Sequence, residues 1–205
     1  MRRTNSIQIF LTIDGERVPM AMNFLGKALN RIGKAVVSIA RKTLNAQGKV
    51  VTGDLSKSLF YSIEGSKDSI EVTFEGSVPY WDFVEQGVQG AISNAKAPDS
   101  PFRFGSGKPQ TTKGTLRGGI DRWVIQKPVG QIRDSKGRFI PRKQMVSAIS
   151  WKVYNYGIAP SDYYAIALDK GWKKSSRTIG KAIGLDVATF VQTNMEGTYT
   201  INITL

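Results

Sequence analysis

The amino-acid sequence predicts an α+β fold, in which an antiparallel or mixed β-sheet with a hairpin packs against a long N-terminal helix and C-terminal helices. Three observations lead to this prediction. Apolar residues alternate with polar ones at both ends of the chain, two further alternating runs flank a turn in the middle, and apolar residues at helical spacing lie between them. We therefore expect a single α+β domain over residues 1–205.

The strands follow from alternation of apolar and polar residues. Residues 6–13 alternate up to the turn Asp14-Gly15 and predict the first strand. Residues 59–63 and 70–74 alternate in the same way around a Gly-Ser-Lys-Asp turn, which predicts a β-hairpin. Residues 199–205 alternate with threonine and asparagine, so we expect a last strand there.

The clearest helix lies between the first strand and the hairpin. Apolar residues recur at steps of four and three from Leu25 to about Asn45, which predicts an amphipathic helix. Gly26 and Gly33 lower its intrinsic stability by about 1 kcal/mol each relative to alanine, unless they let another backbone approach closely. Shorter helices are predicted after the turn at 52–55, within 79–87, over 116–127, over 145–156 up to Gly157, from Asp162 to Leu168 and over 179–190.

Two segments lack this periodicity. Residues 88–118 are rich in glycine and basic side chains, and we expect a long loop or arm inserted into the domain. Residues 128–143 form a second basic loop, with a turn at Asp134-Ser135-Lys136-Gly137.

The composition limits what the protein can do. The chain has 29 lysines and arginines against 16 acidic residues, a net charge of +13, which indicates an anionic partner such as nucleic acid or an acidic protein. It has no histidine and no cysteine, so Ser–His and Cys–His nucleophiles, zinc sites and thiol redox chemistry are excluded. We expect no cofactor and no bound metal. The sequence also has no export signal and no membrane-spanning run of about 18 apolar residues, so we expect no membrane partner.

The long helix is unusually basic. No acidic residue lies between Glu16 and Asp54, whereas helices exposed only to solvent usually alternate glutamate with lysine. Most of its basic residues fall on the face opposite the apolar stripe. That face is either a binding surface for DNA or an acidic subunit, or a plain solvated surface. The residues concerned are Lys27, Arg31, Lys34, Arg41 and Lys42.

Catalytic motifs are weak. Residues 105–108 resemble part of a phosphate-binding loop, but Phe102 replaces its first glycine and Pro109 replaces its serine or threonine. Asp99 together with the segment from Asp134 imitates the acidic motif of Mg²⁺-dependent nucleases, although the second half lies in a turn instead of a strand. We expect no enzymatic activity, and a Mg²⁺-dependent nuclease stays a remote alternative.

Several short motifs, taken in order, resemble the tail-completion or neck proteins of tailed bacteriophages, the head–tail joining family. A Thr-Gly-x-Leu-x-x-Ser turn follows the long helix, and a hairpin and a Tyr…Val-Glu-x-Gly segment come next. A Gly-Ile-x-Pro-Ser segment follows later in the chain. The resemblance covers about residues 20–87 and, more faintly, 120–168; Val88 stands where threonine is usual. The residues that carry it are Thr52, Gly53, Leu55, Ser58, Tyr80, Val84, Glu85, Gly87, Gly157 and Pro160.

This resemblance implies a non-enzymatic structural virion protein that acts in viral assembly. Such a protein would form a homo-oligomeric ring, six subunits being the family-like number, as a neck, tail-completion or tail-terminator component. Its partners would be the phage head–tail connector and tail tube proteins, with non-specific contact to DNA in the channel. It would be located in the virion tail or neck after assembly in the host cytoplasm. The charge alone is explained equally well by a free-standing basic DNA-binding protein.

Overall fold

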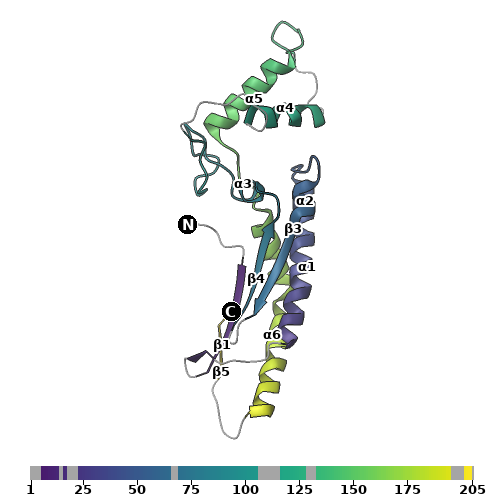
Figure 1. Cartoon of the computed structure of the whole chain (residues 1–205), viewed down its shortest axis with the longest axis vertical. Helices are drawn as coiled ribbons and strands as arrows, with labels where there is room; N and C mark the ends of the chain where they lie inside the picture. The colour runs from purple at the N-terminus through teal and green to yellow at the C-terminus, as the bar shows by residue number, and fades with distance from the viewer. Residues whose placement is uncertain are drawn as a thin grey trace. The chain divides into compact units, whose positions relative to one another are not determined.

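The computed structural model describes residues 6–13, 16–17, 23–65, 69–105, 116–127, 133–194 and 201–204 (Figure 1). Although we expected one domain, the chain divides into two compact units. The sheet unit consists of Arg3–Ala46, Asp54–Val78 and Tyr163–Leu205. The inserted unit consists of Met1–Arg2, Gln47–Gly53 and Pro79–Asp162.

The sheet unit contains an antiparallel sheet with strand order β2-β1-β4-β3, and β5 also pairs with β1. This arrangement, with helices packed on the sheet, confirms the predicted α+β class, the central hairpin (β3 and β4) and the strand at residues 6–13. The last strand is also present, while residues 199–200 and 205 lie outside the described residues. The strands are β1 (Ser6–Ile13), β2 (Glu16–Arg17), β3 (Leu59–Gly65), β4 (Ser69–Gly76) and β5 (Ile201–Thr204).

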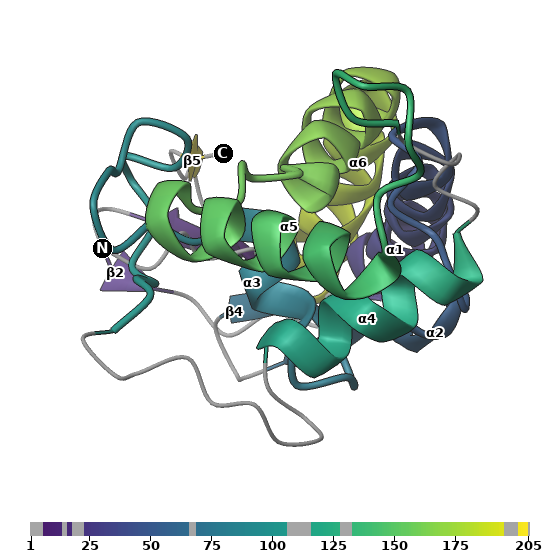
Figure 2. The ribbon, with the colours of Figure 1, turned by 90° about the horizontal axis from the view of Figure 1, so that it is seen from above.

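Helices α1 (Asn23–Ala46) and α6 (Tyr163–Asn194) lie side by side in the sheet unit, as Figures 1 and 2 show, and α1 also packs on β3 and β4. Two glycines permit this close packing. A Cβ atom at Gly171 of α6 would lie 2.7 Å from Cγ2 of Val36 on α1, and one at Gly33 of α1 would collide with the ring of Tyr61 on β3. Gly33 therefore allows a close approach as the sequence suggested, although by a side chain and not by a backbone.

The predicted apolar stripe of α1 is the centre of the core. Leu25, Leu29, Ile32 and Val36 are all buried. Alternate residues of β4 are buried as well, as expected for a strand with one covered face. The confirmed helix begins two residues before Leu25 and ends at Ala46.

Two tyrosines from the start of α6 complete the core. Tyr163 and Tyr164 are fully buried, and the ring of Tyr164 packs on Phe74 with centroids 5.7 Å apart. The Tyr164 hydroxyl lies 2.7 Å from the Glu75 carbonyl oxygen and 3.1 Å from that of Phe60, so it can donate to either. This polar anchor fixes α6 to the β3–β4 hairpin.

The prediction of two separate helices after Asp162 was wrong, because residues 163–194 form one helix. The charged stretch from Asp169 to Thr178 shows no apolar periodicity in the sequence. It continues as helix because Gly171 packs on α1, and Ile179 and Ile183 resume the buried face further along. Tertiary packing of this kind outweighs the low helix propensity of isolated glycines.

A buried carboxylate joins the far part of α6 to the beginning of α1. The two carboxylate oxygens of Asp186 accept hydrogen bonds from the backbone N–H groups of Phe24 (3.0 Å) and Leu25 (2.7 Å). Asp186 is only 2% exposed. It satisfies two of the N–H groups that a helix start leaves without an intrahelical acceptor, and its charge suits the positive end of the helix dipole.

The inserted unit contains the predicted helices at 79–87, 116–127 and 145–156, here α3 (Trp81–Gln86), α4 (Leu116–Gln126) and α5 (Arg142–Tyr156). The short helix predicted after the turn at 52–55 is α2 (Asp54–Ser58) of the sheet unit. None of the helices in the described part of the chain is long and apolar enough to cross a membrane.

Residues 88–105 of the expected arm are held by hydrogen bonds, and the arm ends at the start of α4 instead of at residue 118. The hydroxyl of buried Ser100 donates to the carbonyl oxygen of Gly87 at 2.7 Å, and the Gln89 side-chain amide donates to the Ser100 carbonyl oxygen at 2.8 Å. Within the segment, the Gln89 N–H also donates to the Phe102 carbonyl oxygen, and the Phe104 N–H donates to the Gln89 carbonyl oxygen. Residues 106–115 of the first expected loop and residues 128–132 of the second lie outside the described residues.

Candidate functional site

The basic residues of α1 lie where the sequence placed them, on its exposed face. This face is opposite the buried stripe from Leu25 to Val36. The Lys27 ammonium group lies 5.9 Å from the ring centroid of Phe24, which is itself exposed. The binding role of the face stays a prediction. Its residues are Lys27, Arg31, Lys34, Arg41 and Lys42.

A second basic stripe on α6 was missed by the sequence analysis. Its members are exposed, and one of them, Lys173, pairs with Asp169 at 2.8 Å. The spacing of four, three and four residues from Lys170 to Lys181 would have revealed the stripe if the helix had been predicted as continuous. Together the two helices carry ten of the 29 basic residues and two acidic ones. The α6 stripe consists of Lys170, Lys173, Lys174, Arg177 and Lys181.

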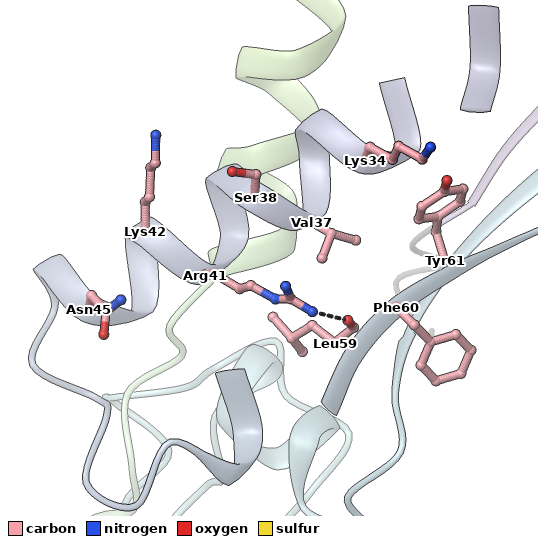
Figure 3. Close-up of a pocket in the computed structure, with 9 residues that line it drawn as sticks. All are labelled: Lys34, Val37, Ser38, Arg41, Lys42, Asn45, Leu59, Phe60 and Tyr61. Atoms are coloured by element: carbon pink, nitrogen blue, oxygen red, sulfur yellow. Dashed lines mark hydrogen bonds between the residues drawn. The ribbon is translucent and has the colours of Figure 1, made fainter. Parts of the chain in front are cut away.

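Part of the α1 face forms the wall of an open groove of about 560 Å³ beside β3 (Figure 3). Arg41 crosses from α1 to the strand, where its guanidinium donates a hydrogen bond to the Leu59 carbonyl oxygen at 3.0 Å. Figure 3 shows Lys34 and Tyr61 at one end of the groove and Lys42 extending away from the strand. The remaining lining residues are Val37, Ser38, Asn45 and Phe60.

The Thr-Gly-x-Leu-x-x-Ser motif forms a turn followed by α2. Gly53 has a φ of 83°, which a glycine adopts without strain. Leu55 is buried, and the Ser58 hydroxyl donates to the Leu55 carbonyl oxygen at 2.8 Å. Thr52 is exposed. Gly53, Leu55 and Ser58 thus have local structural roles that account for their identity.

The two later motifs, far apart in the sequence, meet in the inserted unit and form what we call the glycine junction, residues 84–90 and 157–162. Val88 and Ile158 exchange backbone hydrogen bonds of 2.9 and 2.8 Å. Gly87 and Gly157 flank this pair with φ values of 71° and 74° and ψ values near 180°, a conformation that is nearly restricted to glycine. A Cβ atom at Gly87 would lie 2.6 Å from the Ile158 carbonyl oxygen. The backbones therefore approach as closely as they do only because both residues are glycine.

The remaining motif residues surround the glycine junction. The Ser161 N–H donates to the carbonyl oxygens of Val84 (3.0 Å) and Glu85 (3.1 Å), at the end of α3. Glu85 is 3% exposed, a high degree of burial for a carboxylate, and it has interaction partners. The nitrogen of Pro160 lies 2.7 Å from the position of a Gly87 Cβ. Tyr80, by contrast, is exposed and directly precedes α3.

The acidic residues considered for a nuclease do not form a metal-binding group. Asp134 accepts hydrogen bonds from the backbone N–H groups of Arg138 and Lys136, both at 2.9 Å, and from the Arg138 guanidinium. These bonds, that of the Arg138 N–H above all, lower the pKa of Asp134 despite the opposing effect of desolvation. Asp99 is exposed. Within the described ranges, no group of three or more acidic side chains is arranged to hold a metal ion.

Comparison of the chain with protein-family models, with curated proteins and with solved structures found no match.

Proposed function

We propose that this protein is a non-enzymatic structural component of a tailed-bacteriophage virion. In this proposal it forms a homo-oligomeric ring at the head–tail junction that joins the connector to the tail around the DNA channel. The glycine junction is the observation that carries the proposal. The Val-Glu-x-Gly and Gly-Ile-x-Pro motifs suggested the resemblance independently of each other, and they pack against each other in the structure.

The contact between the motifs supports the resemblance for a physical reason. Two short matches that arose by chance would have no cause to lie in contact. Here Gly87 and Gly157 both have a backbone conformation that is nearly restricted to glycine, and each supports the close approach of the other segment. The residues of these two motifs thus define one structural unit, as expected if they were selected together.

The basic surface of the sheet unit is compatible with a position near DNA. The exposed faces of α1 and α6 carry ten basic side chains, and the second acidic residue of these helices, Asp186, is buried. A surface of this kind attracts phosphate groups without reading base sequence. The α6 stripe favours a second candidate equally well, namely a free-standing DNA-binding protein.

Oligomeric state separates the two candidates. Light scattering of the purified protein, with negative-stain electron microscopy, is expected to show ring-shaped oligomers, with six subunits as the family-like number. A protein that stays monomeric or dimeric at all concentrations and in the presence of DNA, yet binds DNA tightly at low salt, would favour the second candidate. Cleavage of DNA in Mg²⁺ that disappears in Asp99→Ala or Asp134→Ala would contradict both.

The role of the basic surface is tested by changing Lys27, Arg31 and Lys34 together to glutamine. The fold should persist, because exposed substitutions of this kind change stability by about 0.5 kcal/mol or less each. DNA retention or ring assembly should weaken. The plot of log affinity against log salt should become less steep by about 0.9 for each phosphate group that the variant no longer neutralises.

The matched control is the triple change of Lys49, Lys57 and Lys143 to glutamine. It removes the same charge from exposed residues outside the two basic helices. If both triple variants lower the salt slope equally, net charge and not the α1 face attracts the partner.

A further inference from the structure

The open edge of β3 exposes unpaired backbone groups. Among the described strands only β4 pairs with β3. In an antiparallel pair, residues alternate between those that bond across the ladder and those whose N–H and C=O groups point outward. Because the Ser77 N–H donates to the Ser58 carbonyl oxygen at 3.2 Å, the even-numbered residues of β3 bond to β4. Leu59, Tyr61 and Ile63 therefore present their backbone groups at the open edge.

The contact of Arg41 agrees with this assignment. Its guanidinium reaches the carbonyl oxygen of Leu59 from the α1 side, where an odd-numbered carbonyl should point. This contact uses the first outward acceptor of the strand. The outward groups of Tyr61 and Ile63 come next along the same edge.

The edge lacks most of the features that usually prevent strand addition, and its single charged side chain is Glu64, near the end of the strand. Proteins commonly protect an exposed edge with lysine, proline or a bulge. The β3 sequence Leu-Phe-Tyr-Ser-Ile-Glu-Gly contains neither lysine nor proline, and its register with β4 runs from Leu59 to Gly65 without a bulge. A strand of this kind is suited to pair with another extended segment.

The charge beside the edge indicates which segment fits. Lys34, Arg41 and Lys42 lie along the groove wall formed by α1, and no acidic residue lines the groove. Asn45 and Ser38 add polar groups to the same wall. Acidic side chains on an added strand would meet Lys34 and Arg41 across the groove.

We propose that the β3 edge and the adjoining groove bind an extended acidic segment of a partner protein, which adds a strand to the sheet. A peptide is favoured over a nucleic acid because the edge offers alternating N–H and C=O groups at the spacing of another strand. A second copy of β3 is disfavoured because it would bring a second basic α1 face next to the first. The inference is independent of the proposed function, since both a ring protein and a free-standing DNA-binding protein could use the site.

The experiment uses the full chain and a fluorescein-labelled peptide of alternating valine and glutamate. Fluorescence anisotropy is expected to show binding that weakens with salt, and the lysine counterpart of the peptide should not bind. In NMR spectra, the amide signals of Tyr61 and Ile63 should shift more than those of Ser62 and Glu64. This alternation is specific to strand addition.

Two variants separate strand addition from general charge attraction. Ile63→Pro removes an outward N–H, which edge strands tolerate, and should abolish binding. Lys34→Gln with Arg41→Gln should weaken binding about fivefold to tenfold, as expected for two exposed ion pairs. Lys27→Gln with Arg31→Gln removes the same charge from α1 outside the groove and should leave binding unchanged.

Several results would overturn the proposal. One is that the two double variants weaken binding equally, and another is that the amide shifts do not alternate along β3. The proposal also fails if oligothymidylate displaces the peptide and gives the same pattern of shifts, or if the protein self-associates and Ile63→Pro prevents that self-association. If Ile63→Pro unfolds the sheet unit, as judged by circular dichroism, the two double variants and the pattern of amide shifts still decide the outcome.

Discussion

Replacing Gly157 by alanine is expected to destabilise the inserted unit by more than about 3 kcal/mol. Two effects add. A non-glycine residue at φ 74° and ψ −175° costs on the order of 1–3 kcal/mol. The new Cβ atom would also collide with the carbonyl oxygen of Val88 and lie 2.6 Å from the nitrogen of Gly90. Since both neighbours are backbone atoms, relief requires separation of the two segments.

Hydrogen exchange measures this effect locally. The Val88 and Ile158 amides each donate to the other residue's carbonyl oxygen. Both amides should exchange faster in Gly157→Ala by a factor of about 100 or more, the equivalent of about 3 kcal/mol. Gly137→Ala is the matched control, because Gly137 has a φ of 75° but no atom within 4 Å of its Cβ position. Equal destabilisation by the two substitutions would show that the close approach of the backbones contributes nothing.

Replacing Asp186 by alanine is expected to destabilise the sheet unit by about 2–4 kcal/mol. The substitution leaves the N–H groups of Phe24 and Leu25 without their acceptors, and Leu25 is 1% exposed. A buried donor without a partner costs about 1–3 kcal/mol. Asp186→Asn should have an intermediate effect, because one carbonyl oxygen can still accept from one of the two donors.

Urea unfolding of the full chain tests this, with Asp169→Ala as the control on the same helix. Asp169 is exposed and pairs with Lys173 at the surface, so its loss should change the free energy of unfolding by about 0.5 kcal/mol or less. Destabilisation of similar size in Asp186→Ala and Asp169→Ala would mean that the buried carboxylate does not anchor α1.

Hydrophobic periodicity predicted the helices and strands whose buried residues recur at regular spacing within a short stretch of sequence. The stripe of α1 and the alternation in β3 and β4 each repeat over several residues, and packing preserved them. The continuity of α6 could not be predicted in this way. Between Asp169 and Thr178 the one buried residue is Gly171, which has no side chain to leave an apolar signal.

The candidate sites divide in the same manner. The basic face of α1 follows from residue spacing alone, because one predicted helix contains all of it. The glycine junction does not, since the sequence shows two short motifs but nothing that brings Val88 next to Ile158. The groove required knowledge of which strand lies at the sheet edge. Asp186 gave no signal, because a single aspartate in a helix is ordinarily exposed.

The long separation between α1 and the carboxylate that caps it has a consequence for synthesis of the chain. The bond between Leu25 and Asp186 spans 161 residues. At about 5–20 residues per second, a ribosome needs roughly 8–32 s to make the residues between them. For most of this time, until synthesis reaches Tyr163, the apolar stripe of α1 has no α6 to cover it, and the described part of the inserted unit is made first. Aggregation in the cell should therefore respond to the rate of translation between α1 and α6, and a chaperone that binds amphipathic helices would act during that interval.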